Sequence, residues 1–122
     1  TYIAAQRVFP KYNDMTEAKA ILESIARNFG YYLGVQNKVR VNTISQSPTA
    51  TTAGSGVGGF DKMLQFAGDM SPLGNADADE CANMIITMFS DLTRQVTMQN
   101  IFHDGGFSNM GVSQAVLDNY AN

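Results

Sequence analysis

Apolar positions along the chain follow first a helical and then a strand-like spacing. From residue 14 to residue 33 they recur every three or four residues, which predicts one amphipathic helix that ends before Gly34. Asn13 or Asp14 together with Glu17 has the pattern of a capping box at its start. The β-branched segment VRVNTI, Val39–Ile44, predicts a buried strand.

The second half of the chain repeats this alternation. FDKMLQF, Phe60–Phe66, predicts a short helix closed by Gly68 and Pro72, and a helix from Asp77 to Ser90 begins with a capping box between Asp77 and Glu80. A second strand is expected over Val96–His103, ended by the DGG turn, and a short helix within Met110–Tyr120.

The resulting order is helix, strand, loop with helix, helix, strand. Strands separated by helices pair in parallel through right-handed crossovers, and two strands alone make a poor sheet. A buried parallel strand also needs neighbours and helices on both faces. The pattern therefore predicts an α/β fold, as one half of a larger doubly wound parallel sheet.

Composition narrows the function. The chain has 122 residues, 44% of them apolar, with a net charge of −3 and no basic run, which argues against nucleic acid and anionic membranes. We expect no membrane span and no signal peptide, because no apolar run is long enough. One cysteine, Cys81, and one histidine, His103, argue against disulfides, metal sites and a Ser–His pair, and favour the cytoplasm.

Tyr12 and Lys19 are the first candidates for chemistry. They are seven residues apart, or about two turns, so they lie on nearly the same helix face. An ammonium beside a phenol favours the phenolate, and a phenol so placed can stabilise negative charge on a substrate oxygen. The spacing alone favours the simpler interpretation, a tyrosine at the helix start and a solvated lysine.

Three segments carry a resemblance to a known family. YIAAQRVFPKYNDMTEAK, residues 2–19, resembles the tyrosine–tyrosine–lysine signature of bacterial enoyl-acyl-carrier-protein reductases, which are divergent short-chain dehydrogenases/reductases. Ordinary members of that superfamily place the lysine four residues after the tyrosine, where this chain has Thr16. KVRVNTISQSPTATTAGSGVGGFDKM and HDGGFS resemble the strand, cofactor loop, substrate helix and closing turn that follow.

The resemblance implies roles for the three residues of the signature. Tyr2 would hydrogen-bond the thioester carbonyl as it becomes an enolate, and Tyr12 would be the second active-site tyrosine. Lys19 would hold the nicotinamide ribose hydroxyls. The implied reaction is hydride transfer from NADH, or alternatively NADPH, to the β-carbon of a trans-2-enoyl acyl-carrier-protein thioester.

The Ser/Thr/Gly-rich loop after the first strand would contact the cofactor. By resemblance, Pro48, Thr49 and Thr51 line the nicotinamide and the pyrophosphate, whereas composition alone is equally typical of a flexible loop. The chain departs from the family pattern with Ser47 in place of a common glycine and Thr49 in place of the usual isoleucine.

The acyl pocket is expected from four further positions. By resemblance it is lined by Met15, Ala53, Phe60 and Met63, although a Met and a Phe at helical spacing are also typical of a core. GSGVGG suits a mobile lid over about residues 45–72. We expect Cys81 in the core and no catalytic role for His103.

A dinucleotide site needs a Gly-rich turn between a first strand and a helix, and the sequence contains no such unit. We therefore expect residues 1–122 to be the C-terminal half of a Rossmann-type domain that folds only beside its N-terminal half. The resemblance also implies a homotetramer. The alternatives are another short-chain reductase acting on ketones or alcohols, and a truncated, non-catalytic interaction domain.

Overall fold

The computed structural model describes residues 1–121 and confirms the α/β class. The ten elements of the described chain, in order, are η1 (Ile3–Ala5), α1 (Asn13–Asn37), β1 (Thr43–Gln46), α2 (Thr52–Ser55), α3 (Phe60–Met70), α4 (Ala78–Phe89), η2 (Asp91–Thr93), β2 (Asn100–His103), η3 (Phe107–Asn109) and α5 (Gln114–Asp118). Two compact units make up the chain: Thr1–Ser45 with Met84–Phe102, and Gln46–Asn83 with the residues from His103 onward.

The sheet has the predicted parallel direction. β1 and β2 are its two strands in the described part of the chain. The Thr43 amide donates to the Gln99 carbonyl oxygen (2.9 Å), and four residues later the Ser47 amide donates to the His103 carbonyl oxygen (3.2 Å). The offset is the same at both places, so the strands run in the same direction.

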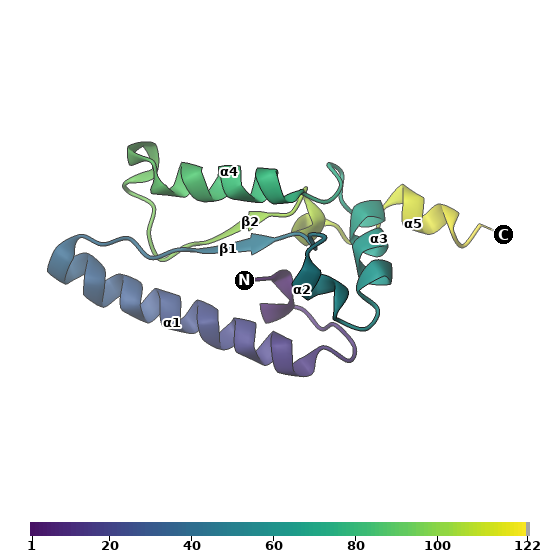
Figure 1. The fold of residues 1–122 in the computed structure, drawn as a ribbon, viewed down its shortest axis with the longest axis horizontal. Coiled ribbons are helices and arrows are strands. Elements are labelled where there is room, and N and C mark those ends of the chain that lie inside the picture. Colours follow the sequence, from purple (N-terminus) through teal and green to yellow (C-terminus); the bar gives the residue numbers. More distant parts are fainter. Residues whose placement is uncertain (122) are drawn as a thin grey trace. The chain divides into compact units, whose positions relative to one another are not determined.

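In the first unit, α1 and the second half of α4 lie on opposite sides of the strands (Figure 1). α1 approaches the chain closely at Gly30, where a Cβ atom would lie 2.6 Å from Met98 Cγ and 3.6 Å from Val41 Cβ. The Arg40 guanidinium donates to the Met88 carbonyl oxygen on α4 (2.6 Å) and to the Val96 carbonyl oxygen in the segment before β2 (3.3 Å).

In the second unit, α3 packs beside α5 and α2 (Figure 1). Ser113 caps α5 and its hydroxyl donates to the Asp69 carbonyl oxygen on α3 (2.6 Å). The DGG turn is fixed by Asp104, a buried carboxylate that accepts the amides of Gly106 (3.1 Å) and Ser108 (3.0 Å).

Two predicted helix ends and one predicted cap are wrong. α1 passes through Gly34 and ends at Asn37, and the left-handed backbone of the next residue, Lys38 (φ 58°), lets its amide reach the Gly34 carbonyl oxygen. α3 likewise passes through Gly68 to Met70, and the capping box expected at Asn13 or Asp14 is absent because the N-cap position is Tyr12. The second capping box is confirmed, with Asp77 and Glu80 exchanging bonds of 2.9 and 2.8 Å.

Both strands are shorter at their start than predicted. Met98 has a left-handed φ of 59°, which an extended strand does not allow, and β2 begins only at Asn100. Opposite this break, the Val41 amide donates to the Thr97 hydroxyl (3.0 Å) instead of a strand carbonyl, so β1 begins at Thr43. Among residues 1–121, no helix combines the length and the apolar character of a bilayer span.

Candidate active site

Tyr2 and Tyr12 meet in the first unit although they are ten positions apart in the sequence. Tyr2 is extended (φ −154°, ψ 153°) and precedes η1, whose Ile3 and Ala4 are buried. Its ring lies edge-on to that of Tyr12, with centroids 6.4 Å apart, and against Phe9 at 5.4 Å. The Tyr2 hydroxyl oxygen is buried. The two phenols of the signature are therefore neighbours.

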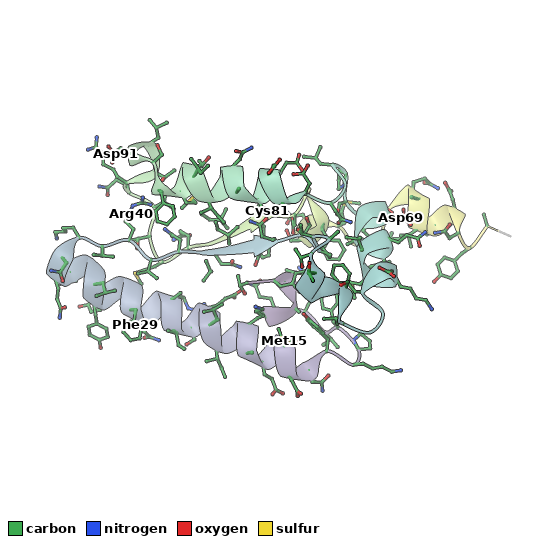
Figure 2. The ribbon with its side chains drawn as sticks, in the orientation of Figure 1. Met15, Phe29, Arg40, Asp69, Cys81 and Asp91 are labelled. Carbon is green, nitrogen blue, oxygen red and sulfur yellow. The ribbon has the colours of Figure 1, made fainter. Side chains whose placement is uncertain are left out.

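Tyr12 is held at the start of α1 by two bonds to its carbonyl oxygen, from the Thr16 amide (3.0 Å) and the Thr16 hydroxyl (2.9 Å). The residue four positions after the tyrosine thus anchors the first turn. Lys19 follows one turn later and is half-buried, as Tyr12 is. Met15 lies between them on α1 and is 42% exposed (Figure 2).

The segment that carries Tyr2 is joined to β1. The main-chain nitrogen of Thr1, the residue before Tyr2, donates to the Ile44 carbonyl oxygen (2.9 Å). Lys19 lies on α1 about two turns after Tyr12, on nearly the same helix face.

Glu23 is a residue that sequence reasoning missed. It is only 5% exposed and accepts a hydrogen bond from the Thr1 hydroxyl at 2.8 Å. A buried carboxylate one turn after Lys19 places negative charge on the same helix face as the ammonium. The signal in the sequence was the four-residue spacing between Lys19 and Glu23.

The cofactor loop belongs to the second unit. Pro48 is buried, and the half-buried Thr49 directs its hydroxyl toward the carbonyl oxygens of Ser47 (3.1 Å) and Ala76 (3.3 Å). Thr51 is exposed, and its hydroxyl oxygen accepts the Gly54 amide (3.0 Å) at the start of α2. A hydroxyl that accepts in this way keeps its hydrogen for an anionic ligand such as a phosphate.

The expected pocket residues of this unit lie on α2 and α3. Phe60 is half-buried at the start of α3, and its ring would lie 3.0 Å from a Cβ atom at Gly54, so it packs closely on α2. Met63 is also half-buried. The side chain of Ala53 lies outside the described residues. Cys81, expected in the core, is half-buried and hydrogen-bonded, as described below.

Comparison with known proteins gives one consistent family. The family model described as enoyl-(acyl carrier protein) reductase matches residues 1–108. The chain is 36% identical over 115 residues to a chloroplastic NADH enoyl-[acyl-carrier-protein] reductase of Arabidopsis thaliana, covering 93% of the chain and 30% of that protein. It is 38% identical over 112 residues to the NADH-dependent FabI of Bacillus cereus, covering 91% and 43%.

Solved structures agree. A FabI–NADH complex from Alistipes finegoldii is 63% identical with a TM-score of 0.91, over 94% of this chain and 41% of that one. The reductase of Plasmodium berghei with triclosan is 32% identical with a TM-score of 0.88, over 93% and 41%. The chain spans between 30% and 44% of the length of the curated relatives it matches. It belongs to the enoyl-(acyl carrier protein) reductase family.

Proposed function

We propose that the chain supplies the reducing site of an enoyl-acyl-carrier-protein reductase of fatty-acid biosynthesis, in the cytoplasm. The observation that carries this proposal is the contact of the Tyr2 and Tyr12 rings, with Lys19 on the helix that follows Tyr12, in a chain of this family. The cofactor is NADH, which the names of the curated relatives specify; NADPH is the alternative.

The donors of this chain fit a nicotinamide dinucleotide. The Lys19 ammonium offers hydrogen bonds to ribose hydroxyls, and the Thr51 hydroxyl offers one to the pyrophosphate. Pro48 and Thr49 would adjoin the nicotinamide, as the resemblance implies. NADH, when bound, supplies the hydride, and the residues of this chain bind the two substrates and stabilise the charge that develops.

Negative charge develops on the thioester oxygen of the enoyl substrate when its β-carbon gains the hydride. Tyr2 donates its hydroxyl hydrogen bond to this oxygen, and the positive charge of Lys19 adds to the stabilisation. Tyr12 takes part in the protonation that completes the reduction at the α-carbon. The resemblance assigns Met15, in the first unit, and Phe60 and Met63, in the second, to the acyl chain, for which soft and aromatic side chains are favourable.

We propose further that an N-terminal half of the same reductase completes the domain. The buried apolar residues of the described chain are few, and many large apolar side chains are exposed. A two-stranded parallel sheet needs further strands for a stable core. Residues 1–122 then form the C-terminal half of a Rossmann-type domain, with the lid at about residues 45–72.

A second copy of the protein is the proposed partner of α1. Its exposed apolar side chains recur every three or four residues, which makes one stripe along the helix: Ile21, Ile25, Phe29, Tyr32 and Val35, with exposures of 47 to 62%. This stripe supports the homotetramer that the resemblance implies. The acyl carrier protein delivers the substrate thioester.

The test uses the complete reductase polypeptide that carries this chain, with crotonyl thioester and NADH followed by absorbance. Tyr2→Phe removes one hydrogen bond to the developing oxyanion and is expected to lower kcat about 10²- to 10³-fold. Lys19→Met is expected to raise the KM for NADH as well. Tyr120→Phe, at an 84% exposed phenol, is the matched control and should leave the rate unchanged.

Two outcomes would contradict the proposal. Full activity of the Tyr2→Phe variant would show that the Tyr2 hydroxyl takes no part in the reaction. Inert wild-type protein that binds no NADH would favour a non-catalytic interaction domain, and turnover of ketones instead of the enoyl thioester would favour another short-chain reductase.

A further inference from the structure

A polar cluster lies at the end of the strands in the second unit, apart from the residues assigned above. Gln46 is the last residue of β1, and its Oε1 atom lies 2.7 Å from His103 Nδ1, at the end of β2. The same oxygen accepts a hydrogen bond from the Cys81 thiol at 3.2 Å. Cys81 is labelled on α4 in Figure 2. An amide oxygen only accepts, so His103 donates from Nδ1, and both lone pairs of the oxygen are used.

The cluster continues into the cofactor loop. The Cys81 sulfur lies 3.6 Å from the Thr49 hydroxyl. Ser47, which is only 4% exposed, donates its amide to the His103 carbonyl oxygen (3.2 Å) and accepts the Ala76 amide on its hydroxyl (2.9 Å). The side chains at both departures from the family pattern, Ser47 and Thr49, therefore hydrogen-bond to neighbouring segments.

We propose that Gln46, His103 and Cys81 are positioning residues for the nicotinamide end of the cofactor loop. This inference rests on the proposed function, because that function assigns Pro48 and Thr49 to the cofactor. A loop of Ser, Thr and Gly has weak conformational preferences of its own. Gln46 holds His103 and Cys81, and these two residues contact the loop: the His103 carbonyl oxygen accepts the Ser47 amide, and the Cys81 sulfur lies beside the Thr49 hydroxyl. A loop ordered in advance binds its ligand at a smaller entropic cost.

Substitutions in this cluster should therefore weaken the binding of NADH and leave the proton-transfer step unchanged. Gln46→Ala removes the acceptor of two hydrogen bonds, each contributing about 1 kcal/mol, or about fivefold. We expect the KM for NADH to rise about 5- to 25-fold, while kcat and the KM for the enoyl thioester stay within about twofold.

A conservative variant and a control variant distinguish the loss of loop positioning from a general loss of folding. Gln46→Glu keeps an accepting oxygen at the reach of Oε1, and should restore most of the affinity for NADH. Gln114→Ala, at an exposed position of α5, should leave the KM unchanged. If Gln46→Ala does not fold, Cys81→Ala removes one donor only, and a two- to fivefold rise in the KM for NADH is expected. An unchanged KM for NADH, or a loss confined to kcat, would overturn the proposal.

A second measurement is independent of turnover. Imidazole ¹⁵N NMR at a pH where His103 is neutral should show the proton on Nδ1, and this signal should change in Gln46→Ala. A neutral His103 ring protonated on Nε2 would contradict the hydrogen bond from His103 to Gln46, and with it the proposal, even in a fully active enzyme. An inactive wild-type protein with the Nδ1 proton would instead contradict the proposed reaction and leave the cluster intact.

Discussion

Gly30 and Gly34 of α1 make a matched pair for testing how this helix packs. They lie one turn apart on the helix that carries Tyr12 and Lys19. At Gly30 an added Cβ atom would lie 2.6 Å from Met98 Cγ, closer than real side chains approach one another. At Gly34 the nearest atom is the Val39 carbonyl oxygen at 3.7 Å, an ordinary contact.

The two substitutions should have opposite effects on the free energy of unfolding. Alanine is favoured over glycine inside a helix by about 1 kcal/mol, and Gly34→Ala should gain nearly all of it. At Gly30 the same gain is opposed by overpacking, which costs about 1–3 kcal/mol in a packed interior. The Met98 side chain must move to admit the Cβ atom, at a residue whose backbone is already left-handed (φ 59°). Gly30→Ala should therefore lose up to about 2 kcal/mol.

Urea unfolding of the two variants in the complete reductase measures this difference. We expect the Gly34→Ala midpoint to rise and the Gly30→Ala midpoint to fall, with a separation of about 1–3 kcal/mol at equal slope. Equal stabilisation by both substitutions would refute the reasoning, since it would mean that Gly30 does not press against residues 41 and 98.

Two further predictions concern a cap and a surface. Asp77→Ala removes the acceptor of the Glu80 amide and should lower the free energy of unfolding in urea by about 0.5–2 kcal/mol. Asp79→Ala, with no cap bond to lose, should cost less. Equal losses in the two variants would contradict the cap. Phe29→Glu places a charge on a 56% exposed side chain of the apolar stripe and should lower the assembly mass in light scattering. Leu117→Glu, at a 50% exposed site on α5, is its control. An unchanged assembly mass for Phe29→Glu would show that this stripe is not part of the interface between copies.

Sequence patterns predicted the helices and their caps correctly where the stabilising interaction joins residues close together in the sequence. The Asp77–Glu80 capping box joins residues three apart, so the pattern in the sequence is also the interaction. The same pattern failed at Asn13 because the start of α1 depends on Tyr12, whose amide donates to the Phe9 carbonyl oxygen in the preceding turn. Gly34 did not end α1, since an interior glycine costs only about 1 kcal/mol, which packing readily offsets.

The candidate site likewise has a part that the sequence predicts and a part that it does not. The spacing of Tyr12 and Lys19 was visible as one helix face, and the resemblance supplied Tyr2 as their companion. The edge-on contact of Tyr2 with Tyr12 needed the turn through η1, which no residue pattern in that segment predicts.

The sequence by itself determined the α/β class, the order of helices and strands, and the family signature at residues 2–19. These depend on periodicity and on residues within one or two turns of each other. Tertiary structure alone decided that Gln46 meets Cys81 and His103, which follow it by 35 and 57 residues. Such partners are set by the parallel pairing of β1 with β2 and by the position of α4, and backbone preferences that act over a few residues carry no information about them.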